Sequence, residues 1–325
     1  MCKSGPWGPL WSTREQLGSS LRINLGGRQD WTTTRAHEDK ANTNLYFAYQ
    51  NTRVTSSSDL HPSGKVRLSY RLPKNFSING GLGHTVRYPD PQERYFALRR
   101  MGSDWVGNPA LRPIRDTGWD AGVSYRHTRV FLSALVYRDA LDNFITLVNQ
   151  PLLNEVPGVS NTRARSYRNT TAGMKGAEIE WMLSLTSRLF LAGDLASVRG
   201  TQKTTPAGGI LSWNLSEIPP LRSRCALRYD RQTESGGFFA ELAAVFSSPQ
   251  KYVDTDLKET PTPGYGLVNL RLGGNLKKFR LTTGISNLAN RDFVEHLSYQ
   301  RDPFRSGVRV PEPGRYYYGS FSYVF

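Results

Sequence analysis

Hydrophobic and polar side chains alternate with a period of two through most of this chain. In residues 236–247, Phe238, Leu242 and Phe246 fall on one face, and Glu241 falls on the other. Successive side chains of a β-strand point to opposite sides, so this alternation predicts a strand with one apolar face and one charged or small polar face. The pattern predicts strands at residues 19–31, 43–54, 63–72, 75–87, 117–127, 129–140, 174–184, 188–199, 221–231, 236–247, 265–275, 278–288 and 315–325.

The connections between these strands alternate between short and long. Short ones are expected at residues 72–75, 127–128, 185–187, 232–236 and 275–277. Long ones are expected at residues 89–116, 142–171, 200–220, 248–264 and 289–314. Tight turns at one end and long, functional loops at the other are typical of membrane-spanning β-barrels, whereas a soluble β-sandwich has no reason to sort its loops by side. The sequence therefore predicts an all-β fold, an antiparallel transmembrane β-barrel.

The polar faces of the expected strands carry charged side chains. Burying these side chains in a narrow soluble barrel would be costly, whereas a wide barrel with a wet lumen leaves them hydrated. We expect them to line the lumen, where the arginines attract anionic ligands by their field. The alternative is that each arginine pairs with a nearby carboxylate. The lumen candidates are Arg87, Arg126, Glu178, Glu180, Arg224, Arg228, Glu241, Arg271 and Arg280.

The composition changes this picture little. The mean hydropathy is −0.50, and no apolar run reaches about 18 residues, so no transmembrane helix is predicted. A membrane barrel keeps its hydropathy low because only every second residue of a strand meets lipid. The 30 glycines, 16 tyrosines and 14 phenylalanines suit many turns and aromatic girdles.

The formal net charge of +15 admits three interpretations. It fits a solvated basic surface, a cavity that attracts anions, or a surface that binds nucleic acid. The basic residues are scattered singly through alternating segments, with no basic run or helical stripe. We therefore expect no nucleic-acid partner.

No catalytic constellation stands out in the sequence. The five histidines fall in separate segments without the spacing of a metal site, and Cys2 and Cys225 are too far apart to form a disulfide framework. We expect no enzyme activity, no cofactor and no metal site. Residues 1–16 lack the apolar region of a signal peptide. We therefore expect that the start of an exported protein has been lost or that the chain is a piece of a longer one.

Five short stretches together resemble the C-terminal part of a TonB-dependent outer-membrane receptor. RYPDPQERY at residues 87–95 and GNPALRP at 107–113 resemble the Arg-x-Pro, Glu-x-Tyr and Gly-Asn-Pro-x-Leu stretch of that family. GAEIE at 176–180 resembles its Gly-x-Glu-x-Glu strand. SNLANRDF at 286–293 resembles its Asn-Leu segment, and PGR at 313–315 resembles the entry into its last strand, with Phe293 where tyrosine is usual.

The resemblance implies a partial barrel in the bacterial outer membrane. The chain would supply about 12–14 of roughly 22 strands as one unit over residues 1–325, without the plug domain. The implied function is TonB-dependent uptake of a metal chelate, a ferric siderophore before copper. The implied partners are outer-membrane lipid, the barrel assembly machinery, the chelate, and the TonB–ExbB–ExbD complex acting only through the missing plug. We expect a truncated fragment that is inactive alone.

Two sets of aromatic and loop residues complete the expectations. By the same resemblance, Phe321, Tyr323 and Phe325 form the signal read by the barrel assembly machinery. The candidates for ligand contact in the outer loops are Tyr95, Trp105, His296 and Tyr299, although the aromatic ones can equally pack the loops together. A passive porin of about 14 strands and a soluble β-rich binding protein remain alternative functions.

Overall fold

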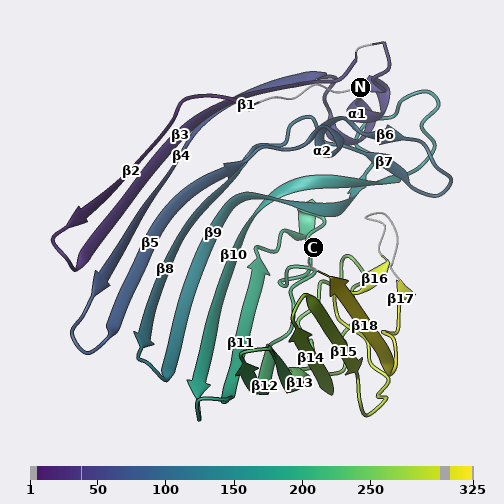
Figure 1. The fold of residues 1–325 in the computed structure, drawn as a ribbon. Coiled ribbons are helices and arrows are strands. Elements are labelled where there is room, and N and C mark those ends of the chain that lie inside the picture. The colour runs from purple at the N-terminus through teal and green to yellow at the C-terminus, as the bar shows by residue number, and fades with distance from the viewer. Residues whose placement is uncertain (1–5, 38, 301–307, 324–325) are drawn as a thin grey trace.

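The computed structural model of the protein describes residues 6–37, 39–300 and 308–323, and most of them form one large, mainly antiparallel sheet (Figure 1). Within these residues the sheet has 16 strands. The main path through the sheet runs, neighbour by neighbour, β1 (Pro6–Trp7), β3 (Leu21–Arg35), β4 (Ser56–Arg71), β5 (Phe76–Arg87), β8 (Ile114–Arg126), β9 (Val130–Pro151), β10 (Arg163–Ser184), β11 (Leu189–Gln202), β12 (Arg222–Thr233), β13 (Gly236–Ser247), β14 (Tyr265–Leu276), β15 (Phe279–Ser286) and β18 (Tyr316–Tyr323).

The remaining elements lie beside this path. β2 (Leu10–Leu17) pairs with β3, while β7 (Asp104–Val106) joins β6 (Ala97–Leu98) to β10. β16 (Tyr299–Gln300) and β17 (Val308–Arg309) form a separate ribbon. The helical pieces are α1 (Thr43–Gln50), α2 (Pro91–Tyr95) and the 3₁₀ turn η1 (Pro206–Gly208). Among the described residues, no helix combines the length and hydropathy that a membrane crossing needs.

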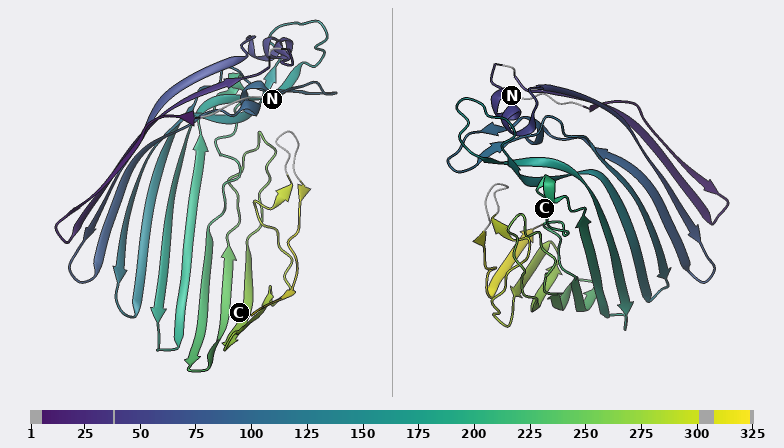
Figure 2. Two further views of the ribbon diagram at one scale, coloured as in Figure 1. Left: turned by 45° about the horizontal axis from the view of Figure 1, so that its top comes forward. Right: turned by 180° about the vertical axis from the view of Figure 1, so that it is seen from behind.

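The two ends of the sheet differ as the sequence predicted. Narrow hairpin turns lie at one end, here called the turn end, and the long connections, α1 and α2 lie at the other, the loop end (Figures 1 and 2). Several hairpin turns contain a residue with positive φ, among them Gly18 (65°), Asn75 (65°) and Lys277 (52°). A left-handed residue lets a very short turn reverse the chain without splaying the strands.

The two faces of the sheet also differ as predicted. In β13, Leu242 is 48% exposed on one side and Glu241 only 9% exposed on the other. We call these sides the apolar face and the charged face. The all-β expectation and the partial barrel are confirmed: the sheet stays open, because within the described residues β18 pairs only with β15, and β1 and β2 pair only with β3.

The strand expected at residues 43–54 is wrong, because this segment contains the helix α1. Its alternating Leu45, Phe47 and Tyr49 imitate a strand, but Leu45, Ala48 and Tyr49 are buried together at helical spacing. The Asn42 side chain accepts a hydrogen bond from the Leu45 N–H and caps the first turn. Burial of this helix against Tyr95 outweighs the local pattern.

The long connection expected at residues 142–171 is largely strand. β9 continues to Pro151 and β10 begins at Arg163, and the two strands stay paired across a register shift. In this bulge, two residues of β9 face one of β10, and Asn143 has a φ of 56°. Leu141 is buried before the bulge, whereas Val148 and Gln150 are buried after it. The extra residue thus changes which side of β9 each position faces.

Candidate functional site

The charged face is most crowded where β12, β13 and β14 lie side by side. Glu241 stands opposite Arg228 on one neighbour and Arg271 on the other. Arg224 Nη2 donates to Glu241 Oε1 (2.7 Å), Arg271 Nη2 donates to Oε2 (3.0 Å), and Arg228 Nη1 lies 3.7 Å from Oε2. One buried carboxylate therefore holds three guanidinium groups, which we call the Glu241 cluster. The alternative that these arginines pair with a carboxylate holds for all three.

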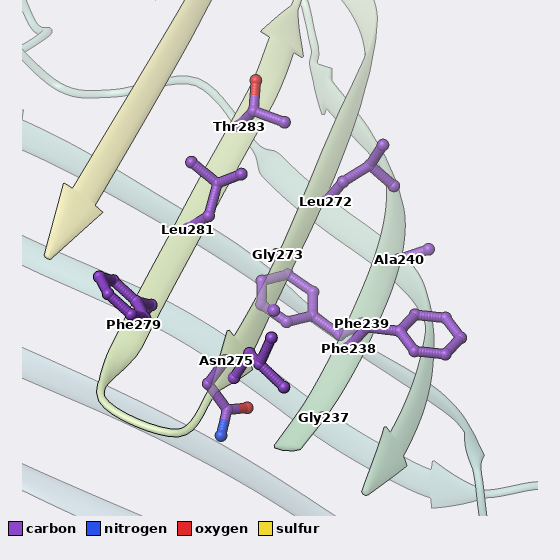
Figure 3. Close-up of a pocket in the computed structure, with 12 residues that line it drawn as sticks. Gly237, Phe238, Phe239, Ala240, Leu272, Gly273, Asn275, Phe279, Leu281 and Thr283 are labelled. Carbon is purple, nitrogen blue, oxygen red and sulfur yellow. The ribbon is translucent and has the colours of Figure 1, made fainter. Parts of the chain in front are cut away.

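An aromatic ring and a second carboxylate complete the Glu241 cluster. Arg228 donates from Nε and Nη2 to Asp230 Oδ2 (3.1 and 2.7 Å). The same guanidinium lies 3.9 Å from the ring centre of Phe239. The ring has room because Gly273 faces it: a Cβ there would lie 2.4 Å from Phe239 Cε1. Phe238 leaves β13 on the opposite side, toward the apolar face (Figure 3). The guanidinium plane and the ring face attract each other at this distance.

A hollow of about 870 Å³ borders the Glu241 cluster. Glu178 and Glu180 on β10 and Asp194 on β11 bring three carboxylates to it, and Arg126 and Arg224 bring two guanidinium groups. Glu178, Glu180 and Arg126 are exposed, and none of them has an ion pair among the described residues. Arg126 instead lies 4.6 Å from the ring centre of Phe131. These free charges face open space and can interact with a solute.

Sequence reasoning missed a further ion pair on the charged face. Arg67 on β4 donates from Nη2 to both oxygens of Asp120 on β8 (3.0 Å each), across the intervening β5. The pair borders hollows of about 310 and 910 Å³. β5 has Gly81 between them, where a Cβ would lie 2.6 Å from Asp120 Oδ1. The alternation of Asp120 with Trp119 was visible in the sequence and would have placed this carboxylate on the charged face.

Several candidates near the loop end contact neighbouring loop residues. Arg87, a candidate for the lumen, forms a two-pronged ion pair with Glu93 (2.8 and 3.0 Å), and Glu93 closes the capping box of α2. Tyr95 is buried among the residues that cover α1. The Arg100 guanidinium lies 4.3 Å from the ring centre of Trp105. The side chain of Tyr299 lies outside the described residues.

His296 is buried where three loops meet. Its Nε2 lies 3.1 Å from Glu259 Oε1 and its Nδ1 lies 3.0 Å from Thr262 Oγ1. Glu259 also accepts hydrogen bonds from the N–H groups of Glu217 (2.9 Å) and Asp254 (2.7 Å). The carboxylate of Glu259 thereby links the connections after β11, β13 and β15, an arrangement we call the Glu259 clasp. Both ring nitrogens of His296 are engaged, so the placement gives His296 a role in joining loops.

Asp254 sits inside the same loops with an unfavourable charge. Its side chain is buried, and this burial, together with the nearby Asp256 and Glu259 carboxylates, raises its pKa to about 6. A raised pKa means that the contribution of this group to stability is present at low pH and is lost as the pH rises through about 6. The ionised carboxylate of Asp254 therefore destabilises the folded loops at neutral pH.

Replacing Asp254 with asparagine is expected to stabilise the protein at neutral pH. In the wild-type protein the Asp256 N–H donates to Asp254 Oδ1 at 2.9 Å. The asparagine amide keeps an oxygen for this hydrogen bond and carries no charge. The free energy of unfolding in urea should rise by about 2 kcal/mol near pH 7.5 and by nothing at a pH well below 3.8, the usual pKa of an aspartate, because Asp254 is then protonated in both the folded and the unfolded protein. The exposed Asp292→Asn serves as control; an equal gain at both pH values would contradict the prediction.

The last strands carry the remaining candidates. Arg280 on β15 is exposed on the charged face. Phe321 and Tyr323 on β18 share the apolar face with Phe279, whose ring centre lies 5.8 and 5.1 Å from theirs. A groove of about 520 Å³ lies between Phe279, Phe238 and their neighbours (Figure 3). Phe325 lies outside the described residues. In residues 6–37, 39–300 and 308–323, no three His, Cys, Asp or Glu side chains gather as metal ligands would.

Comparisons with known proteins agree with this architecture. The family model described as TonB dependent receptor-like, beta-barrel matches residues 13–288. The structure is similar to the copper transporter OprC, with 22% identity and a TM-score of 0.80 over 100% of this chain and 49% of that one. It is also similar to the FrpB iron transporter from Neisseria meningitidis, with 12% identity and a TM-score of 0.69 over 99% of this chain and 45% of that one.

A third similar structure is the ferric yersiniabactin uptake receptor FyuA from Yersinia pestis. The identity is 12% and the TM-score 0.66, over 100% of this chain and 46% of that one. No curated protein matches the chain. At these identities the likeness to solved structures concerns the fold, and the chain spans about half the length of each of the three.

Proposed function

The chain belongs to the family of TonB-dependent receptor β-barrels, and from this premise we propose that it forms part of the wall of an outer-membrane receptor that takes up a metal chelate. The observation that carries the proposal is the division between the two faces of the same strands. The apolar face meets lipid, while the charged face, with the Glu241 cluster and the hollow beside it, lines a wet lumen. Residues 1–325 act as one unit.

The open sheet sets a condition on this function. The backbone groups at the free edges of β2 and β18 need partners in a bilayer, where each unsatisfied group costs several kcal/mol. Further strands must therefore close the barrel. Energy from the TonB–ExbB–ExbD complex would enter through a plug domain, and the described residues include no such domain. The chain alone would then form part of the receptor wall and would not perform active uptake.

The proposed ligand class rests on Arg126 and on the family. Arg126 borders the hollow without an ion pair among the described residues and can contact the anionic groups of a chelate, whereas the free carboxylates of Glu178 and Glu180 in the same hollow repel them. Iron and copper transport are both named among the similar structures, and the ligand we propose is a ferric siderophore that presents anionic groups to Arg126. We place the ferric chelate before copper. The protein would not act as an enzyme.

The decisive experiment measures where the chain goes and what it binds. The chain is produced in a Gram-negative host behind an added signal peptide, because residues 1–16 lack the apolar region of one, and it is expected in the outer-membrane fraction, released only by detergent. Recovery in the soluble fraction would contradict the proposal. A planar-bilayer recording of the purified chain separates it from the passive porin: steady conductance would favour the porin.

Binding is then tested with charge variants in the same hollow. Arg126→Gln should weaken binding of an anionic ferric chelate by about two- to fivefold, while Glu180→Gln should strengthen it by a similar factor, since the two side chains act on the ligand by field. Quenching of tryptophan fluorescence on titration with anionic and neutral ferric chelates provides the measurement. Equal affinities for both chelates in all three proteins would refute the field argument.

A further inference from the structure

A row of three cations crosses the apolar face partway along β9, β10 and β11, on the loop-end side of the apolar band. Lys175 on β10 stands directly opposite Arg138 on β9 and Arg199 on β11. Trp119 on β8 stands opposite Arg138 and extends the row. Register partners of this kind have Cα atoms about 4.5–5.5 Å apart. The three residues are therefore immediate neighbours on three adjacent strands.

The alternation of the strands puts this row on the side that faces lipid. Val136 precedes Arg138 on the same face of β9 and is 46% exposed, and Ala177 follows Lys175 on the same face of β10. Tyr137 and Asp139 point to the opposite, charged face, where Asp139 lines a hollow. The row thus marks the boundary of the apolar band on the side of the loop end.

In the part of the chain that the structure describes, no carboxylate forms an ion pair with the row. Arg138 and Lys175 are exposed, and the described residues give neither an ion pair. The next carboxylate on that face of β9, Asp142, pairs with Arg115 at 3.6 Å. Like charges directly opposite each other on neighbouring strands repel. The repulsion among these cations is therefore electrostatically unfavourable, and a bound anion would relieve it.

The third cation, at the end of the row, is fixed by its own contacts. Arg199 Nη2 donates to Asn214 Oδ1 (2.8 Å), and its guanidinium lies 3.4 Å from the ring centre of Tyr252. Its Nη1 is buried and has no hydrogen-bond partner among the described residues, so no anion neutralises its charge there. An aromatic side chain thus stands at each end of the cationic row, Trp119 at one and Tyr252 at the other. Aromatic residues at such a boundary are typical of the membrane–water interface.

We propose that Arg138 and Lys175 bind the phosphate of a phosphorylated lipid headgroup in the outer leaflet and that Arg199 adds positive charge beside them. In an outer-membrane barrel the long loops face outward, so the row lies at the level of those headgroups. A phosphate brings negative charge and several acceptor oxygens, which match adjacent Lys and Arg donors and relieve their repulsion. The acyl chains of the same lipid cover the apolar band below. This site is separate from the lumen and does not depend on the transported ligand.

Lipid binding is tested with the full 325-residue chain in detergent micelles. Native mass spectrometry counts bound lipid when a phosphorylated glycolipid, the same lipid without phosphate, or inorganic phosphate is added. Arg138→Gln with Lys175→Gln should weaken binding of the phosphorylated lipid by about 25-fold, roughly fivefold for each cation. Arg138→Lys with Lys175→Arg should retain the affinity, which separates charge from a folding defect.

The matched control removes two charges at the opposite end of the sheet. Arg129 and Arg188 are exposed in hairpin turns of the turn end, and Arg129→Gln with Arg188→Gln should leave binding unchanged. Equal loss in the control, or equal binding of the phosphorylated and dephosphorylated lipids, would overturn the proposal. Inorganic phosphate that displaces the lipid completely and binds as tightly would also overturn it, because the source would then be a free anion.

Discussion

Glu241→Gln is expected to lower the free energy of unfolding by about 2–3 kcal/mol, because it leaves three guanidinium groups around a neutral amide. Glu241 is 9% exposed and accepts from Arg224 and Arg271 at 2.7 and 3.0 Å. The amide has one acceptor oxygen instead of two, and its NH₂ group would point at a second donor. The arginines are 41% and 42% exposed at their side chains, so water recovers part of the loss.

Urea unfolding in detergent micelles, followed by tryptophan fluorescence, measures this effect. Glu180→Gln is the matched control, since Glu180 lies on the same charged face, is exposed and has no ion pair in the described residues. Its free energy of unfolding should change by less than about 0.5 kcal/mol. Similar losses for the two variants would show that the Glu241 cluster contributes no more than a single solvated carboxylate.

Glu259→Gln is expected to open the Glu259 clasp and loosen three loops together. The carboxylate of Glu259 accepts from the Glu217 N–H, the Asp254 N–H and His296, and its side chain is 1% exposed. Glutamine offers one oxygen to these donors and adds donors of its own, so the local opening free energy should fall by about 3 kcal/mol. Hydrogen exchange of the Glu217 and Asp254 amides should accelerate by about 100-fold. The exposed Glu155→Gln should leave both rates unchanged.

The clasp also carries a pH dependence of defined sign. Burial by itself raises the pKa of Glu259, but the hydrogen bonds from His296 and from the Asp254 and Glu217 N–H groups outweigh it and hold the pKa below its usual 4.5. A depressed carboxyl pKa gives stability that is present above the usual value and lost as the pH falls through the folded-state value. Loop protection in the wild type should therefore fall on acidification below that range, whereas Glu259→Gln should show no such step.

The alternating pattern was enough to predict the strands and their faces but not the partners of each charge. Glu241 and Arg271 each belonged visibly to a polar face, yet their ion pair depends on the register between β13 and β14, and these strands are joined by the long connection 248–264, with no tight turn to fix that register. Arg67 and Asp120 show the same limit, since they meet across a glycine on the strand between them. Register is a relation between strands, and a single sequence displays only the faces.

The loop end was harder to predict because its contacts follow no period. The helix α1 carried a local signal in Asn42, a residue that favours helix starts, but its alternating aromatic side chains gave the competing strand pattern. The Glu259 clasp had no local signal: Glu259 and His296 come from different loops, and packing brings them together. His296 was expected to contact a ligand from an outer loop, whereas its burial and its hydrogen bonds make it a connection between loops.

The bulge at Asn143 reverses the inward and outward alternation of β9 between the part of the strand that faces the membrane and the part nearer the loop end. Because β9 gains one residue there, the side chains of Val148 and Gln150 turn toward the buried side while Leu141 keeps its place below. The segment on the loop-end side of the bulge, residues 144–170, can thus change in sequence and length without altering which residues on the turn-end side meet lipid. If such segments were exchanged between related barrels, Asn143 would be the safest junction, because the alternation of side chains on one side of the bulge does not set the alternation on the other.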